Sequence, residues 1–338
     1  MMPGRPVDEA RMAASPPPSG DPPWRRKKDQ EVELLDMDAK KILVTGATGA
    51  QGGAVVDAFL AAGWSVRALV RSPDSAASSA LRERGVELAK GDLLDIASLE
   101  TACRGCHAAF SVQMPVVNEV EGARNLAQAA RAAGVKTMIH TSVSSTGWRV
   151  GLSPEKANFL KMYWDCKEGA EQVMRDAGFA SCTILKPAFL MENFLLPKSP
   201  GMFPDLANRQ IVMALATDKP FPSVATSDVG AAALAAATRP DDFNGVDVEL
   251  AGDLSSVGDY AEVIGEVVGV PVSAQFLPAD EVIARGQAAG WVESQRWSGE
   301  VGYIAKPEHQ LAFGLHPTSF RTWAQAHAEG LRQATGSE

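Results

Sequence analysis

A glycine-rich turn near residue 50 places the strongest constraint on how this chain can fold. Residues 42–44 are Ile-Leu-Val, an apolar run typical of a parallel strand buried on both faces. Gly46, Gly49 and Gly52 follow, and residues 54–62 then show the pattern of a helix. Glycine lets the main chain approach a ligand closely, and the free N–H groups that begin a helix suit a pyrophosphate. The order of strand, turn and helix predicts a dinucleotide-binding site, with a plain tight turn as the alternative.

Strands and helices alternate after this turn, which predicts βαβ units and a parallel sheet. Further strands are expected at residues 64–70, 86–89, 108–112, 137–142 and 181–185. Helical patterns separate them, and the helix expected over residues 119–133 has an apolar stripe that should face the sheet. Right-handed crossovers would then produce an α/β fold, a doubly wound parallel Rossmann sheet with a smaller mixed C-terminal lobe.

The pattern becomes irregular after Pro187. Residues 194–224 hold many Pro and Met residues with few clear periods, as a cap over a cleft would. Ser227 is expected to be the N-cap of an alanine-rich helix. The remaining predicted elements are strands at 246–250 and 272–276 and helices at about 258–268, 279–289 and 318–329.

These patterns predict three segments. Residues 1–36 are rich in proline, serine and charge and should form a disordered extension, with the functional chain starting near Met37. Residues 37–193 should form an NAD(P)-binding Rossmann domain. Residues 194–335 should form a substrate or cap lobe, of which about 225–252 packs back on the Rossmann sheet.

Composition limits the classes of partner. A net charge of −9 argues against a general nucleic-acid or anionic-membrane surface. No apolar run reaches the roughly 18 residues that a membrane span needs, and no signal peptide is visible. The four cysteines show no disulfide-framework or zinc pattern, and no cluster of metal ligands stands out. A reduced, cytoplasmic protein without a metal is expected.

The end of the second predicted strand indicates the cofactor. An acid usually stands there to hold the ribose 2′-hydroxyl of NAD, but Arg71 occupies the place. A guanidinium suits a 2′-phosphate, so Arg71 favours NADP(H) over NAD(H) unless it points into solvent. Asp92, after the third strand, should lie at the adenine edge or cap the following turn. Gln113, after the fourth strand, should lie where the ribose or nicotinamide passes.

A Tyr-x-x-x-Lys pair supplies the candidate chemistry. Tyr163 and Lys167 are four residues apart and share one face of a helix that follows the fifth strand. Lys167 can hydrogen-bond the nicotinamide ribose and lower the pKa of Tyr163, whose phenol could then donate a proton to a carbonyl as hydride arrives. Alternatively, Tyr163 is only an amphipathic residue at the mouth of the cleft.

A third catalytic partner is expected among the hydroxyls after the fifth strand. Ser142 and Ser144 are the candidates, although hydroxyls at a strand end also cap turns. His140 lies within the apolar strand and is expected to be a core histidine rather than a general base.

Taken together, these residues resemble the NmrA-like branch of the atypical short-chain dehydrogenases/reductases. The resemblance spans about residues 40–327. The stretches that carry it are Val44–Gly53, Leu69–Pro73, Gly91–Leu93, Tyr163–Glu171, Thr183–Phe194, Ser227–Gly230 and Pro317–Trp323.

The resemblance implies a Rossmann domain, a smaller C-terminal lobe and NAD(P) between them. It implies that Arg71 contacts the 2′-phosphate, that Lys167 contacts the ribose and that residues 187–193 border the nicotinamide. Val143 occupies the place where more typical relatives keep their serine. The predicted cofactor-binding set is Gly46, Thr48, Gly49, Ala50, Gln51, Gly52, Arg71, Asp92, Leu93, Gln113, Lys167, Pro187 and Asn193.

Two functions are predicted, because members of the resembled family divide between them. The first is an NADPH-dependent reductase, monomeric or homodimeric, that reduces a small apolar carbonyl, quinone or conjugated substrate in a cleft between the lobes. The second is a catalytically silent NADP(H) sensor that binds a regulatory partner protein. Tyr163 favours the enzyme. Val143, at the place where more typical relatives keep their catalytic serine, favours the sensor. Direct DNA binding is disfavoured by the acidic charge.

Overall fold

A computed structural model describes residues 40–153, 156–215 and 219–337 of the chain. The predicted extension over residues 1–36 and the predicted start near Met37 lie outside the described residues.

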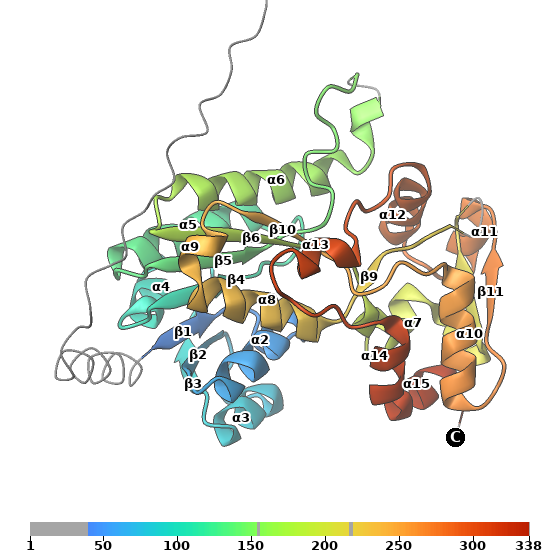
Figure 1. Cartoon of the computed structure of the whole chain (residues 1–338), viewed down its shortest axis with the longest axis horizontal. Coiled ribbons are helices and arrows are strands. Elements are labelled where there is room, and N and C mark those ends of the chain that lie inside the picture. Colours follow the sequence, from blue (N-terminus) through green and yellow to red (C-terminus); the bar gives the residue numbers. More distant parts are fainter. Residues whose placement is uncertain (1–39, 154–155, 216–218, 338) are drawn as a thin grey trace, which may run out of the picture. The chain divides into compact units, whose positions relative to one another are not determined.

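A seven-stranded sheet forms the centre of the described chain, and each pair of neighbouring strands in it is parallel (Figure 1). The strand order is β10-β6-β5-β4-β1-β2-β3, so the direction of the winding reverses between β1 and β4. In open α/β sheets, ligands bind outside the carboxyl ends of the strands at such a switch point. The strands are β1 (Lys41–Val44), β2 (Ser65–Val70), β3 (Glu87–Lys90), β4 (Ala108–Ser111), β5 (Thr137–Thr141), β6 (Ser181–Pro187) and β10 (Asp247–Leu250).

Helices cover both faces of this sheet (Figure 1). Ile42 and Val44 pack in one hydrophobic cluster with α2 (Ala50–Ala61) and α8 (Thr226–Thr238). Leu43 packs in another, which includes residues of α4 (Ile96–Cys103), α5 (Glu119–Ala132) and α6 (Lys161–Asp176). β1 is therefore buried on both faces, and the predicted doubly wound α/β fold is confirmed. The remaining helices of this layer are α3 (Ala76–Glu83) and α9 (Pro240–Phe243).

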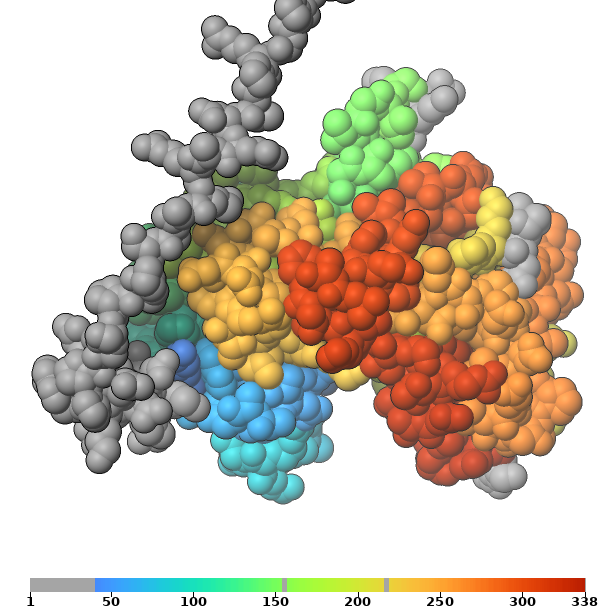
Figure 2. Space-filling view, viewed as in Figure 1, coloured from blue at the N-terminus to red at the C-terminus, as the bar shows by residue number. Residues whose placement is uncertain are grey.

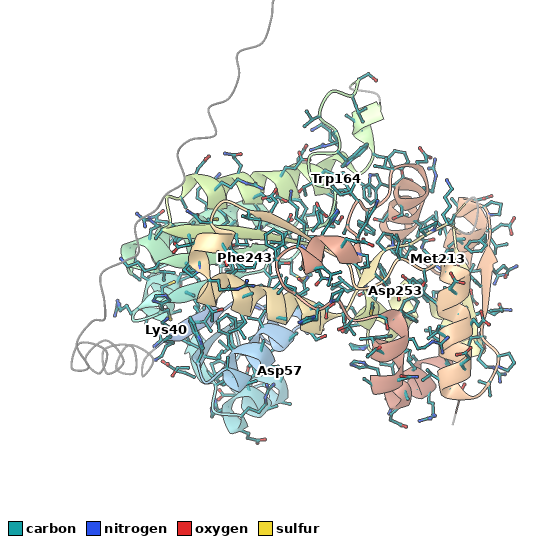
Figure 3. The ribbon with its side chains drawn as sticks, viewed as in Figure 1. Lys40, Asp57, Trp164, Met213, Phe243 and Asp253 are labelled. Carbon is teal, nitrogen blue, oxygen red and sulfur yellow. The ribbon has the colours of Figure 1, made fainter. Side chains whose placement is uncertain are left out.

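The C-terminal part adds two small parallel sheets and a third hydrophobic cluster. β7 (Phe189–Leu190) pairs with β9 (Ser223–Val224), and β8 (Gln210–Met213) pairs with β11 (Ser273–Phe276). Figure 3 labels Phe243, Met213 and Trp164, each of which belongs to a different buried cluster. The helices here are α7 (Ser199–Met202), α10 (Val257–Val268), α11 (Ala279–Ala284), α12 (Ala289–Glu300), α13 (Pro307–Leu311), α14 (Phe320–Ala326) and α15 (Ala328–Thr335), with 3-10 turns at Lys156–Asn158, Met191–Phe194 and Pro204–Asn208.

The orange-red segment around α13 lies against the gold surface of α8 and α9 in the space-filling view (Figure 2). The Phe313 and Phe243 rings are 5.3 Å apart, and the Arg239 guanidinium donates to the Phe313 carbonyl at 2.8 Å. A segment far along the chain thus packs against the helices that cover the central sheet.

Three local predictions in the C-terminal part were wrong. Ser227 is not an N-cap, because α8 begins at Thr226 and Ala225 is the capping residue. The helix expected over 279–289 ends at Ala284, and α12 follows as a separate helix. The helix expected over 318–329 is two helices, interrupted at His327. At the first break Gly286 has a φ of +101°, a conformation that ends a helix. At the second, alanines flank His327 on both sides, so the residue pattern alone did not reveal that break.

Candidate active site

The glycine turn between β1 and α2 brings backbone amides to the edge of the sheet. Gly46 has a φ of +62°, which favours glycine, and its carbonyl accepts the Gly49 N–H at 2.8 Å. A Cβ on Gly52 would lie 2.2 Å from the Gly46 oxygen, so only glycine fits there. None of the described side chains caps the N-terminus of α2. The first N–H groups of the helix, with its positive dipole end, can therefore serve an anion.

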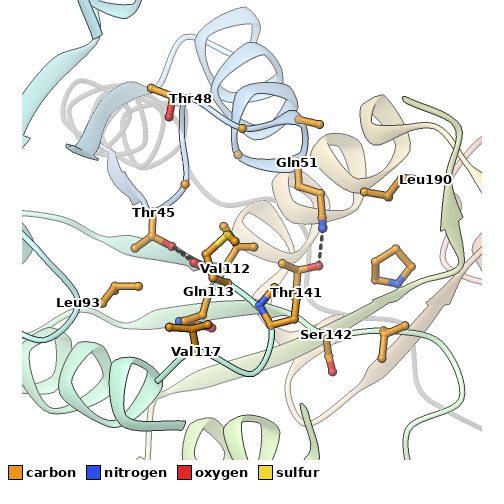
Figure 4. Close-up of a pocket in the computed structure, with 18 of the residues that line it drawn as sticks. Thr45, Thr48, Gln51, Leu93, Val112, Gln113, Val117, Thr141, Ser142 and Leu190 are labelled. Carbon is orange, nitrogen blue, oxygen red and sulfur yellow. Dashed lines mark hydrogen bonds between the residues drawn. The ribbon is translucent and has the colours of Figure 1, made fainter. Parts of the chain in front are cut away.

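Two threonines fix the edges of this turn (Figure 4). The Thr45 hydroxyl accepts the Val112 N–H at 2.8 Å and lies 3.0 Å from the Val112 carbonyl, which ties the end of β1 to the end of β4. The Thr141 hydroxyl donates to the Gln51 side-chain oxygen at 2.7 Å, which ties β5 to α2. No sequence pattern singled out Thr45 or Thr141, because their partners are distant in the chain.

A cavity of about 1050 Å³ opens at the carboxyl ends of the parallel strands. All the predicted cofactor-binding residues and every catalytic candidate except Ser144 line this cavity. They are Gly46, Thr48, Gly49, Ala50, Gln51, Gly52, Arg71, Asp92, Leu93, Gln113, Ser142, Tyr163, Lys167, Pro187 and Asn193.

Arg71 and Asp92 lie where the second and third strands end. Arg71 is exposed and makes no hydrogen bond or ion pair with another of the described residues, so its guanidinium is available to a ligand. The Asp92 carboxylate accepts the Leu94 N–H at 2.9 Å, which is the turn-capping alternative expected from the sequence. Three serines for which no role was predicted also line this end of the cavity, namely Ser72, Ser75 and Ser78.

Gln113 lines the cavity just after the end of β4, and one of its side-chain atoms has no hydrogen-bond partner among the described residues. Its side-chain nitrogen donates to the Ser111 hydroxyl at 2.8 Å, while its Oε1 is buried without a partner among the described residues. The Ser111 hydroxyl is 3.1 Å from His140 Nδ1. His140 is fully buried, and burial lowers its pKa to about 3, which keeps the ring neutral. His140 is thus a core histidine, as expected.

Lys167 is held by an acid that the sequence did not indicate. Its Nζ donates to Glu119 Oε1 at 2.7 Å, and both side chains are almost completely buried. Lys167 Nζ is 5.7 Å from the centre of the Tyr163 ring. Burial raises the pKa of Tyr163, and the Tyr303 phenol and the Glu119 carboxylate add to the rise. The expectation that Lys167 lowers this pKa was wrong, because the ammonium pairs with Glu119 instead.

The hydroxyls after β5 have different surroundings. The Ser142 Oγ is buried at the cavity and has no hydrogen-bond partner among the described residues. Val143 packs with Trp164 and Trp297. The Ser144 hydroxyl accepts the Ala305 N–H at 3.2 Å and does not line the cavity. Of the two candidate serines, only Ser142 faces the cavity.

The wall beyond Lys167 comes from the C-terminal part. Trp291 stacks on Phe189, with ring centres 5.5 Å apart and planes at 22°, and its indole N–H donates to the Met202 carbonyl at 2.9 Å. The cavity is also lined by Lys198, Met202, Trp291, Ser294 and Tyr303. Lys198 and Met202 belong to residues 194–224, the segment expected to cap a cleft, whereas no sequence motif identified the other three. Their contribution arises from the packing of α7 and α12 near the ends of β6 and β7.

The described ranges contain neither a membrane-spanning helix nor a cluster of metal ligands. None of the described helices combines the length and the apolar character needed to cross a membrane. Across residues 40–153, 156–215 and 219–337, no group of three His, Cys, Asp or Glu side chains could hold a metal ion.

Comparison with known proteins gives consistent similarities. The model of the NmrA-like family matches residues 38–324. A (4-alkanoyl-5-oxo-2,5-dihydrofuran-3-yl)methyl phosphate reductase from Streptomyces griseus subsp. griseus is 28% identical over 300 residues, covering 86% of this chain and 99% of that protein.

Solved structures resemble this fold closely. An NADPH-dependent quinone oxidoreductase from Escherichia coli, crystallised with NADPH, matches with a TM-score of 0.66 at 25% identity, covering 85% of this chain and 99% of that one. A negative transcriptional regulator matches with a TM-score of 0.64 at 20% identity, covering 89% of this chain and 92% of that one. At that identity the second likeness concerns the fold alone.

Proposed function

The chain belongs to the NmrA-like family, and from this membership we propose that it is a reductase that uses NADPH to reduce a small apolar carbonyl, quinone or conjugated acceptor. The observation that carries the proposal is the cavity that the glycine turn, Arg71, Lys167 and an aromatic wall line together. Two reductases among the similar proteins support it, one acting on a dihydrofuranone phosphate and the other on quinones with NADPH.

Two features of the cavity fit a nicotinamide dinucleotide. The Gly46–Gly52 contact leaves no room for a side chain, so backbone amides can approach a pyrophosphate directly. The buried Gln113 Oε1 lacks a partner among the described residues and would gain one from a ribose hydroxyl or an amide. Bound NADPH would supply the hydride.

The chain's own residues would bind and orient the reactants. Arg71 would hold the 2′-phosphate by charge-assisted hydrogen bonds, and Lys167 would contact the nicotinamide ribose. Asn193 and Pro187 would border the nicotinamide. Tyr163 keeps its proton because its pKa is raised, so its phenol can donate a hydrogen bond to the oxygen of an acceptor. Ser142, whose hydroxyl has no partner among the described residues, can donate a second hydrogen bond.

The aromatic wall would exclude water and favour planar acceptors. Trp291 and Phe189 offer stacked rings, and Met202 adds an adaptable apolar contact. A dry site also strengthens the hydrogen bonds that hold the acceptor oxygen.

The first test is nucleotide binding followed by turnover. Purified protein is titrated with NADPH and NADH, and the NADPH complex is then mixed with quinones, enones and aldehydes while absorbance is followed. We expect tighter binding of NADPH than of NADH and turnover with at least one acceptor. Arg71→Ala should reduce the preference for NADPH by about 10- to 100-fold, the worth of a charged hydrogen bond. Lys167→Ala should abolish turnover.

Arg124→Ala is the matched control for Arg71, because Arg124 is exposed on α5 and does not line the cavity. It should leave the preference unchanged. Equal loss in both variants would contradict the role of Arg71. Tight NADPH binding without turnover of any acceptor would contradict the proposed reductase and favour the nucleotide-sensing regulator. None of the described contacts favours the regulator.

A further inference from the structure

Two of the chain's three tyrosines stand on the cavity wall. Tyr163 comes from α6, and Tyr303 comes from the short segment between α12 and α13. The third, Tyr260, lies in the C-terminal hydrophobic cluster and does not line the cavity. No sequence motif assigns a role to Tyr303.

The backbone on both sides of Tyr303 is bound to the serines that follow β5. The Ser145 hydroxyl donates to the Gly302 carbonyl at 3.1 Å and accepts the Ile304 N–H at 2.8 Å. The Ser144 hydroxyl accepts the next N–H along, that of Ala305. These bonds join residues about 160 positions apart and hold Tyr303 at the end of a central strand. A side chain fixed in this way is preorganised for a reacting group.

The ring of Tyr303 is also fixed. It packs edge-on against Trp297, with ring centres 5.2 Å apart and planes at 67°, and against Phe221 at 6.2 Å. Trp297 in turn lies 4.8 Å from Trp164, which contacts the Tyr163 ring at 5.2 Å. One aromatic cluster therefore supports both phenols.

The two phenols have different polar neighbours. Burial raises the pKa of Tyr303 to about 12, and a hydrogen bond with the Ser298 hydroxyl opposes the rise. Burial also raises the pKa of Tyr163, and the Tyr303 phenol and the Glu119 carboxylate add to that rise. Ser298 donates to the Ser294 carbonyl at 2.9 Å and can rotate toward a phenolate. Ser298 can thus stabilise a phenolate on Tyr303, whereas the Glu119 carboxylate beside Tyr163 disfavours a phenolate there.

We propose that Tyr303 is the proton donor of this cavity and that Tyr163 only orients the acceptor oxygen, a role that rests on the proposed reductase. As a hydride adds to the acceptor carbon, the π pair of the C=O bond moves to oxygen. The Tyr303 O–H bond breaks and its proton forms the new O–H bond. Ser298 then hydrogen-bonds the phenolate until water returns the proton. The net change consumes NADPH, a proton and the carbonyl, and gives NADP⁺ and the alcohol.

The test compares the three Tyr→Phe variants, with NADPH affinity, kcat and acceptor KM measured for each. Tyr303→Phe should lower kcat by about 100-fold or more, as expected for a lost general acid, with NADPH affinity and acceptor KM nearly unchanged. Tyr163→Phe should raise KM more than it lowers kcat. Tyr260→Phe is the control and should retain the wild-type kcat, since Tyr260 does not line the cavity and its hydroxyl is engaged by the Ser223 hydroxyl and the Phe221 carbonyl.

A cationic triarylmethane dye separates proton donation from a structural effect, because it accepts a hydride without needing a proton. Tyr303→Phe should reduce the dye at the wild-type rate while losing carbonyl reduction. Wild-type kcat for carbonyls in Tyr303→Phe, or an equal loss for dye and carbonyl, would overturn the assignment of Tyr303 alone. Wild-type protein that binds NADPH and reduces nothing would instead overturn the proposed function, and the proton donor with it.

Discussion

At the scale of single residues, the pair formed by Glu119 and Lys167 governs the catalytic end of the cavity. Their side chains are 1% and 7% exposed, and buried charges are tolerated only when they are paired. Glu119 also accepts the Val116 N–H at 3.2 Å. Val116 has a φ of +70°, an unfavourable conformation for a β-branched residue, and this bond helps to hold it. Glu119 thus fixes both Lys167 and the loop that follows β4.

Replacing Glu119 by Gln should lower the free energy of unfolding by about 3 kcal/mol, because Lys167 would lose its charged partner in a buried site. Urea unfolding without nucleotide measures the change. Glu121→Gln is the matched control, since Glu121 is exposed in the same first turn of α5 and should change stability by less than about 0.5 kcal/mol. Equal stabilities of the two variants would show that the Lys167 charge does not depend on Glu119.

At the scale of elements, the unit formed by β1, the glycine turn and α2 contains two adjacent glycines, Gly52 and Gly53. Their surroundings leave different amounts of room for a side chain. A Cβ on Gly52 would lie 2.2 Å from the Gly46 oxygen and 2.8 Å from the Ala47 nitrogen, and both are backbone atoms. A Cβ on Gly53 would meet nothing nearer than the Ala47 oxygen at 3.6 Å, an ordinary contact. Only the first glycine is required by close packing.

We expect Gly52→Ala to lose measurable NADPH binding and to destabilise the protein by about 1–3 kcal/mol or more, because the turn must move away from α2. Gly53→Ala should retain binding and gain up to about 1 kcal/mol, since alanine is the better helix former. Nucleotide titration and urea unfolding of both variants provide the measurement. Normal NADPH binding by Gly52→Ala would mean that the pyrophosphate does not lie on this turn.

At the scale of the whole described chain, Asp228 connects the central layer with the C-terminal helices. It lies in the first turn of α8, and its two oxygens accept the Thr318 N–H at 2.9 Å and the Thr318 hydroxyl at 2.6 Å. Gly252 closes the same junction, because a Cβ there would lie 2.1 Å from the Thr318 carbonyl. Burial raises the pKa of Asp228, although its hydrogen bonds with Thr318 oppose the rise.

This junction predicts a pH dependence of stability. Because the pKa of Asp228 is higher in the folded state than its ordinary value of 3.8, the folded state binds more protons between the two values. Its contribution to stability is therefore complete below pH 3.8 and is lost as pH rises through the raised pKa. The difference in unfolding free energy between wild type and Asp228→Asn should shrink as pH rises through this window.

Urea unfolding of wild type and Asp228→Asn at closely spaced pH values from about 4 to 7 would measure this difference. Asp241→Asn, at an exposed position on α9, is the control and should follow the wild-type profile. A difference that grows with pH would mean that folding lowers the pKa of Asp228 instead of raising it.

The sequence by itself determined the central sheet, the glycine turn and the residues that line the cavity along the ends of the strands. Such features follow from short local patterns: an apolar run predicts a buried strand, and parallel strands bring their carboxyl ends to one edge. That is why Arg71, Gln113 and Lys167 could be placed together from the sequence.

Only the tertiary structure decided which partners these residues have. The Glu119 carboxylate accepts a hydrogen bond from the Lys167 ammonium although the two residues are 48 positions apart. The Ser145 hydroxyl binds the backbone beside Tyr303, about 160 positions further along the chain. Trp291 and Tyr303 enter the cavity through the packing of α12 and the segment after it. Hydrogen bonds and ring contacts between distant segments leave no periodic trace in the sequence, because they depend on where the folded chain returns rather than on neighbouring residues.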